Sequence, residues 1–145
     1  MIYAESQKFI FFAVPKTGTH SVREALRPHL SSADWEQQLR YGEQLSPLPE
    51  IAAIKHGHVS YRQLSSVVGP ETLSRFFRFA FTRHPYDRFV SVCAFLARTD
   101  PSYKQHPTEW MKSALKRPQF CNRVLVASQH ALLRDENGAL GLDFV

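Results

Sequence analysis

Two continuous apolar stretches, rich in aromatic residues, stand out along the chain. They cover residues 8–14 and 76–81, and a proline follows each within a few positions. A short apolar run without polar alternation is typical of a strand buried on both faces of a sheet. We therefore predict two buried strands there, and a third, shorter strand over residues 51–55.

Helical spacing follows each long apolar run. Val22, Ala25, Leu26 and Leu30 recur at helical intervals and predict a helix over about residues 19–30. A second apolar stripe is formed by Tyr86, Phe89, Val90, Cys93 and Leu96. Shorter patterns predict helices over residues 33–41 with Ser32 as a cap, over residues 60–68 ending at Gly69-Pro70, and over residues 110–116.

The order of these elements indicates the fold class. Strand, loop and helix recur along the chain, which favours an α/β fold with a mostly parallel sheet flanked by helices. Asn137-Gly138 lies between the apolar stretches 131–133 and 140–142 and predicts a hairpin turn. The sequence contains no repeat, linker or low-complexity tract, so we expect one domain over residues 1–145.

Composition limits the classes of partner. Of 145 residues, 43% are hydrophobic, which is enough for a core, and the formal net charge of +5 favours anionic partners. No interleaved aromatic-basic motif or zinc-finger spacing is found, so we expect no nucleic-acid partner. Cys93 and Cys121 lack metal-ligand spacing; reduced thiols are the favoured interpretation, with a single bridge as the alternative.

The apolar run over residues 9–14 is the candidate for an N-terminal targeting signal. It is too short for a signal-peptide core and lacks a basic leader. No stretch approaches the roughly 20 apolar residues of a membrane helix. We expect a cytoplasmic protein with no membrane partner, unless a leader was removed before this numbering begins.

The segment from Pro15 to Ser21 connects the first strand to the first helix. The N–H groups at a helix N-terminus have no intrahelical partner and carry partial positive charge. Gly18 would allow close backbone approach, and Lys16 would add a mobile cation. The segment therefore predicts a phosphate-binding loop, although an ordinary strand-to-helix turn with a solvated lysine is the alternative.

A second polar segment runs from Arg83 to Ser91. Arg83 follows a predicted strand directly, at the edge where open α/β sheets bind ligands. An arginine and a serine can hold a second phosphate through charge-assisted hydrogen bonds. The alternative is that Arg83 and Arg88 pair with acidic groups such as Asp87 on the surface.

Together the two segments resemble sulfotransferases that use 3′-phosphoadenosine 5′-phosphosulfate (PAPS), in the branch of carbohydrate sulfotransferases and their bacterial relatives. That family has a Pro-Lys-x-Gly-Thr-x-Ser-like loop after the first strand and a later Arg-x-Pro-x-x-Arg-x-x-Ser element. Here they read Pro15-Lys16-Thr17-Gly18-Thr19-His20-Ser21 and Arg83-His84-Pro85-Tyr86-Asp87-Arg88-Phe89-Val90-Ser91. The likeness runs over nearly the whole chain.

The resemblance implies a P-loop-containing nucleotide hydrolase-like fold and a set of PAPS contacts. Lys16 would contact the 5′-phosphate and the oxygen that bridges to sulfur. Arg83 and Ser91 would bind the 3′-phosphate, and Arg88 would either join them or serve the structure. Backbone or hydroxyl donors to the 5′-phosphate would come from Thr17, Gly18, Thr19, His20 and Ser21.

The segment Lys55-His56-Gly57-His58 carries two histidines. A histidine that titrates near neutrality suits removal of a proton from an acceptor hydroxyl. Some carbohydrate sulfotransferases have a similar His-Gly-His-Val stretch with their general base, which implies His58 as the base and His56 as the reserve. A pair of structural histidines is the alternative. No third ligand accompanies them, so we expect no metal.

Two departures from the family pattern, and two other functions, remain open. His20 stands where many relatives have a small residue or threonine, and the chain ends about where relatives continue, so we expect a domain short at its C-terminus.

A P-loop kinase or nucleotide hydrolase is disfavoured because Lys16 precedes Gly18 and no Walker B aspartate is clear. A nonenzymatic nucleotide-binding module is the other alternative. A second copy of the chain could cover an incomplete sheet edge, giving a homodimer.

Overall fold

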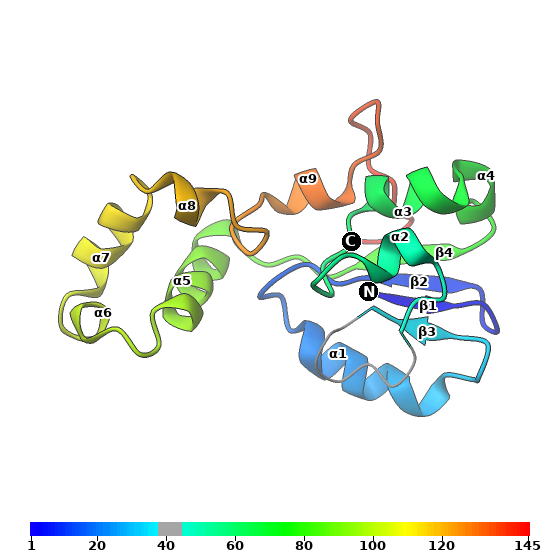
Figure 1. Ribbon diagram of the computed structural model, residues 1–145, viewed down its shortest axis with the longest axis horizontal. Coiled ribbons are helices and arrows are strands. Elements are labelled where there is room, and N and C mark those ends of the chain that lie inside the picture. The colour runs from blue at the N-terminus through cyan, green and yellow to red at the C-terminus, as the bar shows by residue number, and fades with distance from the viewer. Residues whose placement is uncertain (38–44) are drawn as a thin grey trace.

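A mixed sheet forms the centre of the larger lobe (Figure 1). The computed structural model describes residues 1–37 and 45–145. The strands are β1 (Ile2–Ala4), β2 (Phe9–Phe12), β3 (Trp35–Glu36) and β4 (Phe77–Ala80), in the order β3-β1-β2-β4. β2 and β4 are parallel, whereas β1 pairs antiparallel with both β2 and β3.

The prediction of a mostly parallel sheet is therefore wrong, although the α/β class is confirmed. The cause is β1, which the sequence analysis missed. Only residues 5–8 separate β1 from β2. So short a connection can join antiparallel neighbours but not parallel ones, which need a crossover of a dozen or more residues.

The helices mostly begin at prolines, which suit a first helical position because they lack the N–H that would be unpaired there. Such a proline starts α2, α4, α5, α6, α7 and α8. The helices of the described residues are α1 (Thr19–Leu26), the 3₁₀ turn η1 (Arg27–His29), α2 (Pro49–Ala52), α3 (Tyr61–Val68), α4 (Pro70–Leu73), α5 (Pro85–Leu96), α6 (Pro101–Gln105), α7 (Pro107–Ala114), α8 (Pro118–Cys121) and α9 (Gln129–Leu133).

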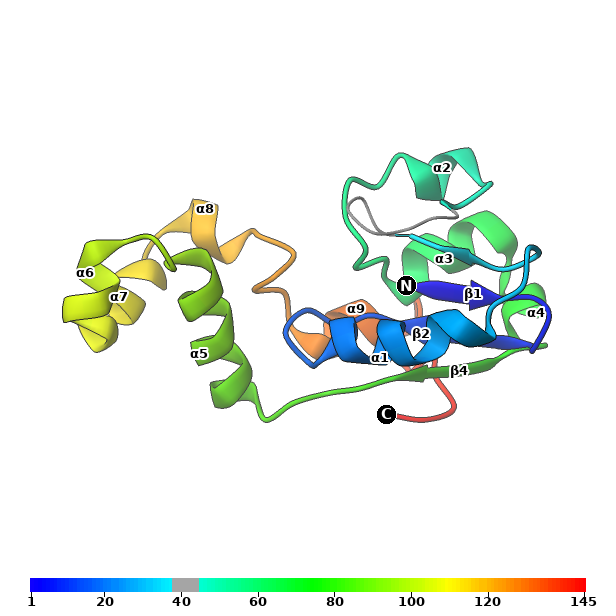
Figure 2. The ribbon, with the colours of Figure 1, turned by 90° about the horizontal axis from the view of Figure 1, so that it is seen from below.

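Each face of the sheet has its own hydrophobic cluster, because side chains alternate along a strand. Helix α1 covers one face, where Phe11 is fully buried with Val22 and Leu26 packed nearby. Helices α3, α4 and α9 lie on the opposite face, where Ile10 and Phe12 are buried (Figures 1 and 2). The central strand β2 is thus covered on both sides.

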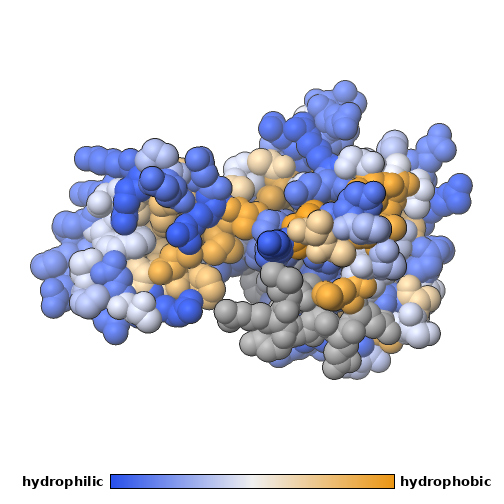
Figure 3. All heavy atoms as spheres, viewed as in Figure 1, coloured by the Kyte–Doolittle hydropathy of each residue, from blue (hydrophilic) through white to orange (hydrophobic). Residues whose placement is uncertain are grey.

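Helices α5 to α8 form a separate helical lobe with its own small core (Figures 1 and 2). Its buried residues are Val92, Cys93, Ala114 and Phe120. Hydrophobic residues reach the surface between the two lobes, whereas the outer ends are mainly hydrophilic (Figure 3). Exposed apolar side chains in the segment that enters the helical lobe include Phe81, Tyr86, Val90 and Phe95.

Two sequence predictions are wrong for identifiable reasons. Residues 35–36, expected to be helical within 33–41, form β3, because Trp35 stacks on Tyr3 at 4.9 Å and pairs with β1. Residues 38–41 of that prediction lie outside the described residues. The strand expected over residues 51–55 is instead the end of α2 followed by a turn. Pro49 starts this helix, and Ile51 is the residue that it buries.

Other predictions are confirmed with adjusted bounds. α1 ends at Leu26 and tightens into η1, because Pro28 has no N–H to continue the α-helical ladder. Ser60 caps α3 through a reciprocal capping box with Gln63. The hairpin expected around Asn137-Gly138 is confirmed only as a turn: among the described residues a single antiparallel bridge, between Arg134 and Leu140, flanks it, and residues 129–133 are helical.

Candidate functional site

The loop between β2 and α1 has a special backbone. Lys16 has a φ of +64° and Gly18, the N-cap of α1, has a φ of +80°. Such angles are uncommon for residues other than glycine. A Cβ at Gly18 would meet no atom within 4 Å. Glycine therefore serves the backbone conformation here, and the space beside it is open.

The side chains of this loop are directed to different places. The Thr17 hydroxyl donates a hydrogen bond to the Val14 carbonyl at 3.0 Å, so its hydrogen is used within the loop. The imidazole of His20 lies along α1, with Nε2 3.0 Å from a carboxylate oxygen of Glu24. Thr19 is half-buried and Ser21 is exposed. Close to the open space beside Gly18, the main donors are thus the backbone N–H groups that begin α1.

Lys16 points toward the helical lobe. Its ammonium nitrogen lies 4.6 Å from the ring centre of Phe95 on α5. The guanidinium carbon of Arg98 lies 5.1 Å from the same ring. An aromatic face attracts cations, so Phe95 gathers positive charge beside the loop. The sequence signal for Phe95 was its position four residues after Ser91, on the same helical face.

The second motif begins at the same sheet edge as the first. β2 and β4 run parallel with Phe12 opposite Ala80, so their carboxyl ends lie together. Arg83 follows three residues after β4, and its side chain is exposed. Its backbone N–H and carbonyl bond the side-chain amide of Gln129 on α9, at 2.9 and 2.8 Å. Sequence reasoning missed Gln129, because nothing local links positions 83 and 129.

Arg88 is buried and joins the two motifs directly. Its Nε donates to the Pro15 carbonyl at 2.9 Å, at the start of the loop that carries Lys16. Its Nη2 donates to the carbonyls of Leu125 and Ala127, each at 2.9 Å. Ser91, one turn further along α5, lies on the same face between Arg88 and Phe95. Arg88 therefore holds helix α5 against the loop.

His58 contacts the chain at the point where β2 leads into the same loop. Its Nδ1 is 2.7 Å from the Ala13 carbonyl at the end of β2. An imidazole nitrogen that faces a carbonyl must carry the proton, which leaves Nε2 with a free lone pair. Burial lowers the pKa of His58 to about 4, against the effect of the Ala13 carbonyl, so the ring is neutral near pH 7.

His56 is placed less directly. Its Nδ1 accepts a hydrogen bond from the backbone N–H of His58 at 3.3 Å, and the two ring centres are 6.1 Å apart. Burial also lowers the pKa of His56. His56 thus supports the turn that places His58, while the His58 ring itself contacts the strand that leads into the loop.

The structure therefore gathers most of the predicted site residues around residues 13–16. Lys16, His58 and the Arg88–Ser91 face of α5 meet there through the contacts above. Arg83 shares the sheet edge but has an exposed side chain. Within residues 1–37 and 45–145, no side chain or backbone group makes a hydrogen bond or ion pair with its guanidinium.

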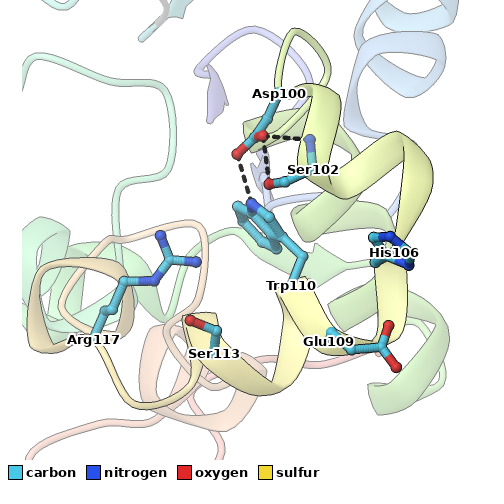
Figure 4. Close-up of a pocket in the computed structure, with 7 residues that line it drawn as sticks. All are labelled: Asp100, Ser102, His106, Glu109, Trp110, Ser113 and Arg117. Carbon is cyan, nitrogen blue, oxygen red and sulfur yellow. Dashed lines mark hydrogen bonds between the residues drawn. The ribbon is translucent and has the colours of Figure 1, made fainter.

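A separate cavity lies in the helical lobe (Figure 4). It measures about 610 Å³, and the Trp110 indole N–H donates to Asp100 at 2.7 Å on one side of it. The guanidinium carbon of Arg117 lies 4.9 Å from the Trp110 ring centre. It shares no residue with the predicted site, since it is lined by Asp100, Ser102, His106, Glu109, Trp110, Ser113 and Arg117.

The described residues, 1–37 and 45–145, hold neither a cluster of metal ligands nor a helix that could span a membrane. Over the described ranges, 1–37 and 45–145, no three or more His, Cys, Asp or Glu side chains gather as metal ligands would. In the part of the chain that the structure describes, each helix falls short of the length and apolar character needed to cross a membrane. Cys93 is buried and Cys121 exposed, and both are free thiols.

Comparison with known proteins identifies the family. No curated protein and no solved structure matches the chain. A family model does match, and it covers residues 1–124, which include both motifs, the His56–His58 segment and the cavity. On this match the chain belongs to the sulfotransferase family.

Proposed function

We propose that this sulfotransferase takes its sulfuryl group from PAPS and transfers it to a hydroxyl group of a carbohydrate acceptor. The hydrogen bond from Arg88 to the Pro15 carbonyl is the observation that carries this proposal. It joins the segment suited to the 5′-phosphosulfate to the segment suited to the 3′-phosphate. A single nucleotide with phosphates at both ends would fit such a pair of segments.

The residues of the loop fit a phosphate group. The open space at Gly18 lets phosphate oxygens approach the first N–H groups of α1, which carry partial positive charge. Thr17, Thr19, His20 and Ser21 would contribute mainly through their backbone N–H groups. Lys16 would leave the ring of Phe95 and place its ammonium beside the 5′-phosphate.

The 3′-phosphate would contact Arg83 and Ser91. Arg83 is exposed at the shared sheet edge, and Ser91 is half-buried on the face of α5 that also carries Arg88. Charge-assisted hydrogen bonds from these groups would hold an anion there. For Arg88 we propose a structural role, because its hydrogen bonds go to backbone carbonyls and its side chain is 7% exposed.

Transfer would need alignment and neutralisation of charge more than covalent help from the protein. PAPS supplies a sulfuryl group whose bond to the bridging phosphate oxygen breaks while a new bond forms between sulfur and the acceptor oxygen. Lys16 would stabilise the negative charge that grows on that bridging oxygen. His58 Nε2 would accept the proton that the acceptor hydroxyl loses.

His58 suits this base role through its tautomer. The Ala13 carbonyl fixes the proton on Nδ1, so Nε2 is free to accept. Its pKa of about 4 makes it a weak base that is always unprotonated near neutrality. A weak base is adequate where proton transfer accompanies formation of the oxygen–sulfur bond, because the hydroxyl becomes acidic as that bond forms. His56 remains the reserve candidate.

Calorimetric titration of the protein with 3′-phosphoadenosine 5′-phosphate (PAP), PAPS and magnesium-ATP tests the donor. We expect binding of PAP and PAPS, with much weaker binding of magnesium-ATP, which lacks the 3′-phosphate. Tighter binding of magnesium-ATP would instead favour a kinase or nucleotide hydrolase. Release of PAP from PAPS, measured with a panel of neutral oligosaccharides, then tests transfer and the acceptor class.

A further inference from the structure

We propose that Arg23 and Gly57 act as positioning residues. Their contact fixes the turn that contains His58 against helix α1, the helix that begins at the phosphate-binding loop. The catalytic meaning of this inference rests on the proposed role of His58 as base. The inference itself concerns a contact between two segments that are far apart in sequence. It explains why an arginine and a glycine are needed at these positions.

Arg23 lies one turn into α1 and is 4% exposed. Its Nη2 donates to the Gly57 carbonyl at 3.0 Å and to the Gln37 carbonyl at 3.4 Å. Its Nε lies 3.1 Å from a carboxylate oxygen of Glu36 on β3. A planar guanidinium can serve a carboxylate and a carbonyl at once, whereas a lysine ammonium is a single point of charge.

Gly57 is the matching half of this contact. A Cβ built at Gly57 would lie 2.5 Å from Arg23 Nη2 and 2.7 Å from the Gln37 carbonyl oxygen. Both approaches are far shorter than real carbon contacts, and the second involves backbone that cannot rotate away. The guanidinium can therefore lie against this turn only if residue 57 has no side chain.

These contacts close a ring around the phosphate-binding loop. Starting from α1, Arg23 holds Gly57, the next residue His58 bonds the Ala13 carbonyl, and the chain continues from Ala13 through the loop back to α1. A shift of α1 would therefore move the turn that holds His58. The position of the proposed base and the position of the phosphate donors are set together.

The ring also explains the surroundings of His58. The Ala13 carbonyl faces its Nδ1, and the groups whose positive charge lowers its pKa are Arg23, His56 and the α-amino group of Met1. The Met1 amino group donates to the same Gly57 carbonyl at 2.6 Å. Burial is the largest cause of the lowered pKa, so release of the turn would bring the pKa of His58 back toward its ordinary value of ~6.5.

Arg27 supplies a matched control. It lies on η1 and pairs with the same carboxylate: its Nε and Nη2 donate to the two carboxylate oxygens of Glu36, at 2.8 and 3.1 Å. Substitution of Arg27 by methionine thus removes a cation from Glu36 without touching the turn. Arg23→Met removes both the pairing with Glu36 and the contact with Gly57.

Nitrogen-15 NMR of the histidine side chains reads the result without any acceptor. In the wild type and in Arg27→Met we expect His58 as the Nδ1–H tautomer with its low pKa. In Arg23→Met and in Gly57→Ala, which keeps every charge, we expect the tautomer to become mixed and the pKa to rise by more than about one unit. Arg23→Lys should show an intermediate shift.

Folding of each variant is checked by its thermal transition. If Arg23→Met does not fold, Gly57→Ala and Arg23→Lys decide the question. Folded variants in which His58 keeps the wild-type tautomer and pKa would overturn the proposal. So would an Arg27→Met variant that shifts His58 as strongly as Arg23→Met, because the effect would then come from Glu36 and not from the turn.

A second readout separates this inference from the proposed function. We expect Gly57→Ala to slow PAP release from PAPS about 10²-fold while its PAP affinity stays at the wild-type level, because a misplaced base costs rate and not nucleotide binding. If the wild type binds neither PAP nor PAPS, the proposed function fails while the NMR result still stands. If PAP binds normally and His58 does not respond, the positioning role alone is wrong.

Discussion

The two segments proposed to bind phosphate differ in what supports them. The first follows the central strand β2, whose Ile10, Phe11 and Phe12 are buried from both faces. The second follows β4, where Phe77 is exposed, as is Phe81 directly after the strand, and leads through Arg83 into a separate helical lobe. The first is therefore built on the core of the sheet, whereas the second depends on how the helical lobe is held.

This difference assigns distinct tasks to similar residues. In the first segment the cation, Lys16, contacts the Phe95 ring of α5, and the backbone is held between β2 and α1. In the second, Arg88 holds the lobe through its hydrogen bond to the Pro15 carbonyl, whereas Arg83 is exposed at the surface. We infer that the site for the 5′-phosphosulfate is formed by the sheet, and that the site for the 3′-phosphate is completed by docking of the lobe.

The largest effect is expected in the first segment, from Lys16→Ala. Removal of the ammonium should slow PAP release from PAPS by about 10²–10³-fold, because the cation proposed to stabilise the leaving phosphate is lost. The thermal transition should not change. The control is Lys104→Ala, because Lys104 is an exposed lysine of the helical lobe. Turnover near the wild-type level in Lys16→Ala would remove the lysine from the reaction.

The second largest effect is expected from His58→Gln, which changes the histidine that contacts the Ala13 carbonyl just before the first segment. We expect turnover to fall about 10²-fold with PAP affinity unchanged, as for loss of a general base. In the wild type the pKa of about 4 means that His58 stays neutral as the pH falls from 7, so the rate should decline only near pH 4. A decline centred near ~6.5 would mean an ordinary, exposed histidine. Equal losses in turnover and PAP affinity would reassign His58 to binding.

The two arginines of the second segment are compared most directly by replacing each of them in turn with methionine. Arg88→Met leaves carbonyls of both lobes without their donor, and we expect the free energy of unfolding to fall by about 3 kcal/mol. That corresponds to a melting temperature lower by about 10 °C. Arg83→Met should leave melting unchanged and weaken PAP binding about tenfold. Calorimetry and thermal melting of both variants would contradict the division of tasks if the two effects were reversed.

The smallest effect is expected from Phe95→Leu. The ring holds the ammonium of Lys16 in the ligand-free protein, a contact worth about 0.5–1 kcal/mol at an exposed site. Its loss should raise PAP affinity by about two- to fivefold, because Lys16 no longer leaves a favourable contact. Phe95→Tyr keeps an aromatic face and is the control. Weaker PAP binding in Phe95→Leu would show that the ring instead directs Lys16 toward the phosphate.

Local sequence patterns predicted the elements that carry the two motifs. The apolar runs of β2 and β4, the loop at Gly18 and helix α5 all follow from periodicity and turn chemistry within a few residues. The helix predicted over residues 60–68 is equally local, and the structure adds that Ser60 and Gln63 cap it. β1 was missed because three residues are too short for a pattern, and the pairing of Trp35 with Tyr3 overrode a helical pattern around it.

The sequence by itself determined which residues have the type and spacing suited to a phosphate, because these properties belong to one loop or one helix. Only the tertiary structure decided that Arg88 is a buried support while Arg83 is exposed, and that Arg23 meets Gly57. These outcomes depend on which carbonyl lies opposite a guanidinium in the folded chain. Such contacts join positions 34 to 73 residues apart, and no local pattern specifies them.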